Sequence, residues 1–303
     1  MSTIDLIGVP FDGYGRPDNQ AHAAAALRAA GLATAFSGRE IVVRPDTRLP
    51  AQTGARSPHS GLMNEPAVIA MADALRADVR TGLSEGHFPL IYGGDCSVLL
   101  GAVPGLRDTF GKAGLVFLDG HEDATTLDAS PDGEVANMEI ALLLGLAGDR
   151  VPEALRKHLP ALGLDTLAML GPRDSAWIDQ LGMPSLVERG VLLYTPEAIA
   201  SDPAQRARQA VKHVASRAPS WWLHTDLDIL SADEFAAGGV GPDDALLPGG
   251  LRWNELTEVV SAALRAGGCA GWSVTIYNPN LDPDGSEARR IVRFVTDVAP
   301  FLP

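Results

Sequence analysis

Short, continuous apolar runs alternate along the chain with longer segments whose apolar residues recur at helical spacing. The short runs predict β-strands at residues 4–9, 40–43, 88–92, 114–118, 166–170, 191–194, 221–225 and 270–276. The longer segments predict helices, notably at residues 21–30, 66–81, 134–146, 203–216, 253–266 and 286–298. Apolar strands that alternate with helices are typical of a parallel sheet covered on both faces. We therefore expect a three-layer α/β/α fold with a mainly parallel sheet of about eight strands.

No internal repeat or low-complexity linker interrupts this alternation, so we expect a single domain over residues 1–303. Two loops, residues 44–60 and 231–250, are long and rich in Gly, Pro and Asp. Loops of this length in a compact domain more often surround a functional site than merely connect two elements.

Composition and charge narrow the class of protein. The 38 acidic and 24 basic residues give a net charge of −14, which argues against nucleic acid or an anionic membrane as partner. Cys96 and Cys269 lie far apart, so no disulfide is expected and a reducing cytoplasm is the expected compartment. The apolar run 140–147 is too short to cross a bilayer, and the first ten residues resemble a strand more than a signal peptide.

Two predicted strands end in carboxylates. Asp119-Gly120-His121-Glu122-Asp123 follows one of them, and Asp226-Leu227-Asp228 follows another. Because side chains alternate at a strand end, the first, third and fifth residues of the longer run can face one point, as can Asp226 and Asp228. Ligands of open α/β sheets bind at this end of the strands. Four carboxylates and an imidazole in one crevice repel each other without a cation, so we predict one or two divalent metals and metal-assisted hydrolysis.

A third segment, Gly93-Gly94-Asp95-Cys96-Ser97, follows the strand at 88–92. With the two acidic segments it resembles the ureohydrolase family of arginase, agmatinase and formiminoglutamase. The acidic segments are similar to the family's Asp-Ala-His-x-Asp and Asp-x-Asp motifs. Further matches, in chain order around these motifs, are Ile7-Gly8-Val9-Pro10-Phe11, Pro248-Gly249-Gly250-Leu251 and Asn278-Pro279.

The resemblance implies a site with two Mn²⁺ ions. Asp119 and Asp226 would bridge the ions, His121 and Asp228 would complete one site, and Asp123 would serve the other together with Cys96. Hydroxide held between the ions would attack the planar carbon of an amidino group. We predict a catalytic role for Asp119, Asp123 and His224, the last of which lies two residues before Asp226.

Several positions depart from the family pattern. Cys96 replaces a histidine ligand, and a thiolate is a softer donor that favours Zn²⁺, Fe²⁺, Co²⁺ or Ni²⁺ over Mn²⁺. Ile276 replaces the glutamate that binds guanidinium, a loss that costs about 2–5 kcal/mol of binding and argues against plain arginase or agmatinase activity. The family has an amine-binding acid at the position of Ala176, a further acid at that of Ser231 and a proton-shuttling histidine at that of Val135.

Three functions stay open at this point. The first is a hydrolase with two metals that cleaves a linear C–N bond in an amidine or guanidine, such as a modified arginine. The second is a single-metal enzyme that hydrolyses an acylated amine, similar to the related deacetylases. The third is a catalytically silent relative, in which Cys96 could be a buried hydrophobic residue and His224 a core histidine. The expected partner is a small-molecule substrate, and the resemblance implies a homo-oligomer, a trimer or hexamer.

Overall fold

The computed structural model describes residues 2–15, 19–239 and 247–303. Its centre is an eight-stranded sheet with the strand order β2-β1-β3-β8-β7-β4-β5-β6, in which every neighbouring pair is parallel. The strands are β1 (Ile4–Gly8), β2 (Ile41–Val43), β3 (Phe88–Tyr92), β4 (Gly114–Leu118), β5 (Leu167–Leu170), β6 (Leu192–Tyr194), β7 (Trp221–Asp226) and β8 (Cys269–Thr275). All eight expected strands are present, and the predicted α/β fold class is confirmed.

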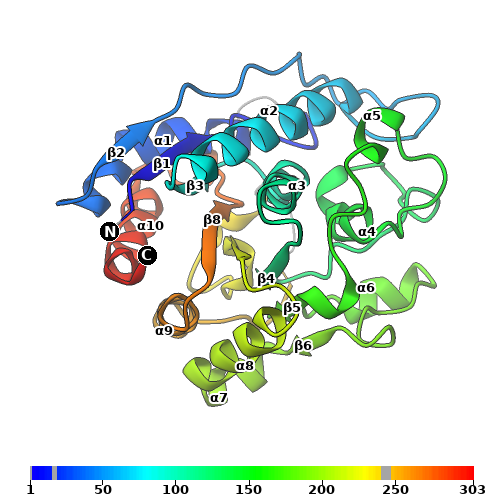
Figure 1. Cartoon of the computed structure of the whole chain (residues 1–303). Helices are drawn as coiled ribbons and strands as arrows, with labels where there is room; N and C mark the ends of the chain where they lie inside the picture. Colours follow the sequence, from blue (N-terminus) through cyan, green and yellow to red (C-terminus); the bar gives the residue numbers. More distant parts are fainter. Residues whose placement is uncertain (1, 16–18, 240–246) are drawn as a thin grey trace.

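Helices cover both faces of this sheet (Figure 1). The α-helices in the described residues are α1 (Ala23–Ala29), α2 (Glu65–Ser84), α3 (Leu99–Phe110), α4 (Glu139–Leu144), α5 (Glu153–Arg156), α6 (Ser175–Gln180), α7 (Pro196–Ser201), α8 (Pro203–Ala215), α9 (Trp253–Arg265) and α10 (Ser286–Val298). Short 3-10 helices are η1 (Gln20–His22), η2 (Leu32–Phe36), η3 (Cys96–Val98), η4 (Val135–Asn137), η5 (Leu164–Thr166), η6 (Leu227–Ile229), η7 (Ala236–Gly238), η8 (Pro279–Leu281) and η9 (Ala299–Phe301). None of the helices described is long and apolar enough to cross a membrane.

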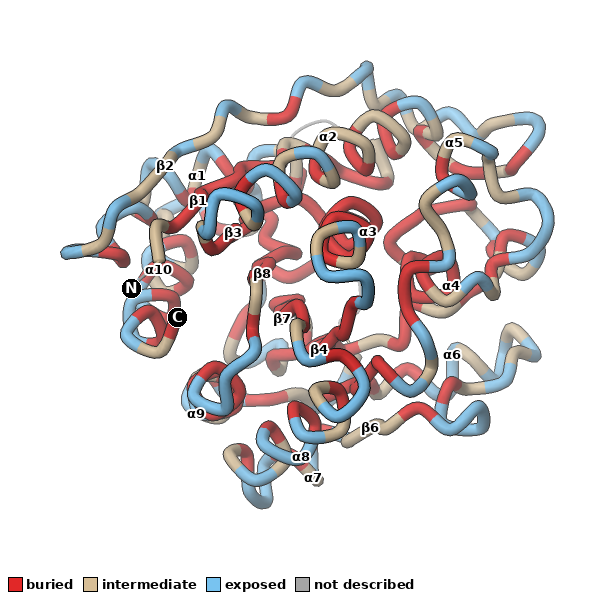
Figure 2. The backbone as a smooth tube through the Cα atoms, viewed as in Figure 1, coloured by how far each residue is buried: buried red, intermediate tan, exposed pale blue. Residues whose placement is uncertain are grey.

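Strand β4 shows why the central strands are apolar throughout. Val116 and Leu118 pack into the core on the side of α1, α8, α9 and α10, while Leu115 and Phe117 pack into the core beneath α2, α3 and α4. Successive side chains on a strand point to opposite faces, so a sheet with a core on each face requires apolar residues at every position. Figure 2 shows this burial in the central strands, whereas the edge strands β2 and β6 are only partly buried.

Two helical segments differ from the sequence expectation. The helix predicted at 134–146 is divided into η4 and α4, because Met138 between them has an extended φ of −144°. Helix α3 was not among the expected helices, since its segment contains Pro104, Gly101 and Gly105. The glycines are required by close packing on α2: a Cβ on Gly101 would lie 2.5 Å from the Leu75 Cβ.

The topology places the carboxyl ends of β3, β8, β7 and β4 side by side in the middle of the sheet. The chain segments that follow these strands therefore meet at one edge, which is where ligands bind in parallel α/β folds. Of the loop expected at 231–250, residues 240–246 lie outside the described part of the chain, and the described part contains η7.

Candidate metal centre

The ends of β3, β7 and β4 bring Cys96, Asp119 and Asp226 together, although β8 lies between β3 and β7 in the sheet. Asp119 directly follows β4, Asp226 ends β7, and Cys96 begins η3 after the double-glycine turn that ends β3. β4 and β7 pair as far as Leu118 and Thr225, so the two aspartates that follow lie next to each other. One ligand atom from each of the three residues lies within 4.8 Å of the others, and all three residues are buried. The structure thus brings Asp226 to two residues that lie more than 100 positions before it in the sequence.

A second group consists of Asp119, His121 and Asp228. The His121 Nδ1 atom lies 3.1 Å from Asp228 Oδ2 and 3.4 Å from Asp119 Oδ1. Backbone hydrogen bonds fix both acids, since His121 N donates to Asp119 Oδ1 at 2.8 Å and Gly120 N donates to Asp228 Oδ1 at 3.0 Å. Asp119 belongs to both groups, which is the arrangement expected of a residue that bridges two ions.

Asp123 completes a third group with Cys96 and Glu139, again with ligand atoms within 4.8 Å of one another. Glu139 was not among the expected site residues. Its position on the buried face of α4, in line with Leu142 and Leu143, is the sequence signal that could have identified it. An acid among apolar residues on a buried helix face requires a partner.

The acids perturb each other strongly. Burial, followed by repulsion from Asp228, raises the pKa of Asp119 to about 7. Burial and neighbouring acids also raise the pKa values of Asp123, Asp226 and the Cys96 thiol well above their ordinary values. Burial lowers the pKa of His121, but the charge of Asp228 and hydrogen bonds to both acids outweigh this and raise it well above its usual value. Cys96 donates its thiol hydrogen to the Ala136 carbonyl at 3.1 Å.

The chemistry of these donors fits divalent metal. Asp119 Oδ2 and both carboxylate oxygens of Glu139 are buried and have no hydrogen-bond partner among the described residues. Buried carboxylates without donors are costly, and they are stabilised when they coordinate a cation. The mixture of carboxylate oxygen, imidazole nitrogen and thiol sulfur suits Zn²⁺, Fe²⁺ or Co²⁺ as well as Mn²⁺.

A cavity of about 420 Å³ adjoins the ligand groups, and its lining includes Cys96, His121, Asp123, Asp226 and Asp228. Its wall carries acids outside the three ligand groups, namely Asp95, Glu122, Asp132, Glu134 and Asp174, and the basic residue Arg173. Arg173 Nη2 donates to the Asp228 carbonyl at 2.7 Å and so holds the ligand segment. The wall also carries large apolar residues, among them Trp177, Ile178, Leu181, Met183, Pro184 and Ile276.

The positions that depart from the family pattern are found at different places. Ile276 lies on the cavity wall, where its φ of +60° is a strained backbone conformation for a β-branched residue. Among the described lining residues, Ala136 reaches the cavity and its neighbour Val135 does not. Ala176 and Ser231 do not line the cavity; Trp177 next to Ala176 does.

His224 does not occupy the place expected of a catalytic residue. Its side chain is fully buried, is stacked on Phe117 at 5.2 Å and is not part of the cavity wall. Its Nδ1 atom lies 2.7 Å from Ser273 Oγ and its Nε2 atom 3.4 Å from Thr275 Oγ1. Burial lowers the pKa of His224 to about 3, so the ring is neutral. The catalytic role predicted for His224 stays a prediction, and the structure places its side chain in the core beneath the cavity wall.

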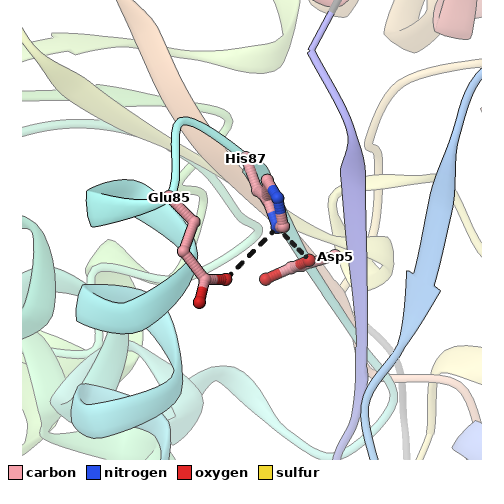
Figure 3. Close-up of side chains that lie close together, drawn as sticks. All are labelled: Asp5, Glu85 and His87. Atoms are coloured by element: carbon pink, nitrogen blue, oxygen red, sulfur yellow. Dashed lines mark hydrogen bonds and ion pairs between the residues drawn. The ribbon is translucent and has the colours of Figure 1, made fainter.

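A separate cluster of possible ligands, Asp5, Glu85 and His87, lies at the amino ends of β1 and β3, the opposite edge of the sheet (Figure 3). His87 Nδ1 is 2.8 Å from Asp5 Oδ1 and 3.6 Å from Glu85 Oε2. Arg44 Nη2 contacts both acids, at 2.5 Å and 3.2 Å. A guanidinium thus already compensates these carboxylates, and the cluster is an ion-pair network.

Comparison with known proteins agrees with this geometry. The profile of the arginase family matches residues 2–299. Arginase from Bacillus subtilis is 25% identical over 293 residues, which cover 97% of this chain and 96% of that protein.

Solved structures show the same fold. The arginase structure from Bacillus caldovelox superposes with a TM-score of 0.83 at 24% identity, covering 99% of this chain and 98% of that one. The formimidoylglutamase structure from Bacillus subtilis gives 0.73 at 17% identity, with 99% and 87% covered. With the family profile matching nearly its whole length, the chain belongs to the arginase, or ureohydrolase, family of hydrolases.

Proposed function

We propose that this protein is a metal-dependent hydrolase that cleaves a linear C–N bond in an amidine or guanidine derivative. The observation that carries the proposal is that Asp119 joins the group of Cys96 and Asp226 to the group of His121 and Asp228, beside an acidic cavity. Asp119 and Asp226 would hold both ions, His121 and Asp228 one of them, and Cys96 and Asp123 the other. Two divalent ions there would supply positive charge that activates water and polarises the scissile group.

The residues around the ligands would orient the substrate. Asp174 lies on the wall with its Oδ1 atom buried and without a hydrogen-bond partner, so it can accept from an N–H group of a bound cation. The acidic wall as a whole favours a positively charged amidinium or guanidinium. Binding of that group would in turn depend on acids other than the family glutamate, because Ile276 cannot accept a hydrogen bond.

The apolar wall restricts the rest of the substrate. Trp177, Ile178 and Leu181 on and just beyond α6 face the cavity, where an alkyl or aryl group would contact them. We therefore propose a substrate that carries its amidino group on an apolar body and lacks the amino-acid end of arginine. Contact between this apolar body and the apolar residues of the wall would favour binding, because burial of apolar surface contributes about 25 cal/mol per Å².

A panel assay tests the proposal. Wild type and Asp226→Asn would be incubated with alkyl and aryl amidines and guanidines, agmatine and arginine, each with Mn²⁺, Co²⁺, Zn²⁺ or Fe²⁺, and ammonia and urea release would be measured. We expect turnover by wild type, with apolar substrates preferred, and none by Asp226→Asn. Ile276→Glu should improve binding of agmatine at least about tenfold by restoring a guanidinium acceptor. No turnover of any substrate with any metal would contradict the proposal.

A second candidate is a single-metal hydrolase of an acylated amine. The observation that favours it is the group Asp119, His121 and Asp228, because one imidazole and two carboxylates are a typical zinc set with room for water. Release of acetate from acylated amines by protein that holds one Zn²⁺ per chain would favour this candidate.

A further inference from the structure

Glu139 is the feature of the site that neither the family pattern nor the sequence motifs explain. It is the first residue of α4, has 0% exposed surface, and has both carboxylate oxygens buried without a hydrogen-bond partner among the described residues. A buried carboxylate of this kind needs a donor or a cation, because its desolvation is otherwise not compensated.

The groups nearest to Glu139 in this cluster are a carboxyl and a thiol, so no cationic side chain in the cluster compensates its charge. Its carboxylate, the Asp123 carboxylate and the Cys96 sulfur lie within 4.8 Å of one another, and all three residues are buried. Cys96 also lies within 4.8 Å of Asp119 and Asp226 in the adjoining group. Its thiol hydrogen is directed to the Ala136 carbonyl rather than to an acid. Glu139 therefore extends the ligand cluster on the Cys96 side.

Backbone contacts fix this arrangement. Ile140 N, next to Glu139, donates to the Asp123 carbonyl at 3.0 Å, and Thr125 N donates to the Asn137 carbonyl at 3.0 Å. Together with the bond from Cys96 to Ala136, these contacts join the start of α4 to both ligand segments. Glu139 is thus held at the cluster by the fold, as expected of a preorganised ligand.

We propose that Glu139 is a metal ligand, and that with Cys96 and Asp123 it forms a thiolate–carboxylate site for the first of the two ions. This rests on the metal dependence of the proposed function and adds to it. The site replaces a neutral imidazole by two anionic donors, one of them soft. Such a set favours Zn²⁺, Fe²⁺ or Co²⁺ over Mn²⁺ at this position, because thiolates select softer ions.

Cobalt titration of the metal-free protein tests this ligand set. Wild type, Glu139→Gln and a control, Glu122→Gln, would be compared by equilibrium dialysis and by the absorption of thiolate-bound Co²⁺. Glu122 is a suitable control because it is buried and lies between two ligands, yet its carboxylate accepts hydrogen bonds from Ser185 Oγ and Leu186 N. Thermal unfolding of each metal-free variant would be recorded alongside.

We expect Glu139→Gln to lower the affinity for the Co²⁺ ion that gives the thiolate band at least about tenfold, because even indirect changes near a metal lower affinity 10–100-fold. The affinity for the other ion should be unchanged. Metal-free Glu139→Gln should melt at or above wild type, since an unpaired buried acid has been removed. Glu122→Gln should bind both ions as wild type does. Two Co²⁺ bound by Glu139→Gln with wild-type affinity would overturn the role of Glu139 alone. No Co²⁺ bound by wild type would overturn the metal dependence of the proposed function as well.

Discussion

A cluster of acids lies at each end of the parallel strands, but only the cluster at the amino ends contains a guanidinium that pairs with its buried acid. At the amino ends, Asp5 is paired with Arg44 and His87, and Arg44 also contacts Glu85. At the carboxyl ends, Asp119 and its neighbours face one imidazole, that of His121, and several of their oxygens have no partner among the described residues. The first cluster is complete as the chain folds, whereas the second requires positive charge from outside the chain.

This difference separates a structural ion-pair network from a binding site. Acidic residues with a histidine within ligand distance occur at both edges, so proximity alone does not identify a metal site. The unpartnered oxygens and the adjoining cavity distinguish the carboxyl edge. Loss of an ion-pair partner at the amino ends of the strands should therefore lower stability and leave metal binding unchanged. Loss of an acid at the carboxyl ends should weaken metal binding.

The largest effect is expected from Asp226→Asn at the carboxyl edge. In the proposed site Asp226 would hold both ions, so metal affinity should fall by more than the 10–100-fold that indirect changes cause, and hydrolysis should be lost. Elemental analysis and the panel assay measure both quantities. Wild-type metal content in this variant would show that Asp226 is not a shared ligand.

Arg44→Met should affect stability and leave metal binding unchanged. It leaves the fully buried Asp5 with only His87, and removal of one partner from a buried ion pair costs about 3–5 kcal/mol. Arg28→Met is the matched control, because its partner Asp46 is exposed and such pairs contribute about 1 kcal/mol or less. Urea unfolding measures both variants; an equal loss in the two would contradict the special role of the buried pair.

The metal-free protein should become less stable as the pH rises from about 4 to about 7. Burial raises the pKa of Asp119 and of Asp95 from 3.8 to about 7, so the folded state binds more protons than the unfolded state in this range. Above pH 7 the metal-free protein should keep this full loss of stability. A divalent metal at 100 times its Kd should raise the free energy of unfolding by about 2.7 kcal/mol. Melting temperatures at pH 5 and pH 8, with and without Co²⁺, measure the difference. Equal effects of Co²⁺ at both pH values would contradict ion binding by the acids.

The smallest effect is expected from His224→Gln. Loss of a hydrogen bond to Ser273 or Thr275 should lower stability by about 1 kcal/mol, and turnover should fall less than tenfold. Removal of a general base would instead reduce turnover about 10²–10⁴-fold and flatten the pH profile of kcat. The second result would restore the catalytic role first expected of His224.

The sequence predicted the strands and most of the ligand cluster because both depend on local pattern. Asp119, His121 and Asp123 follow an apolar run at alternate positions, and this spacing alone placed them at a sheet edge. His224 shares a face of β7 with Asp226, but it lies two residues before the end of the strand and therefore packs on Phe117 in the core instead of lining the cavity. Glu139 was missed because its partners, Asp123 and Cys96, are brought to it only by tertiary structure.

Helix α3 shows the same limit. Its proline and glycines disfavour a helix locally, but Gly101 and Gly105 permit the close contact with α2 that stabilises it. Packing of α3 on α2 outweighs the low helix propensity of this segment, and that packing cannot be predicted from the pattern of apolar and polar residues alone.

Metal content per chain, measured by elemental analysis on protein purified without chelators, tests the central claim most directly. Wild type should contain close to two divalent ions per chain, as expected for a binuclear hydrolytic site, and Arg44→Met should contain the same number. Wild-type protein that contains no metal, and that binds none when Mn²⁺, Zn²⁺, Fe²⁺ or Co²⁺ is added, would contradict the claim that the carboxyl-edge acids are a metal centre.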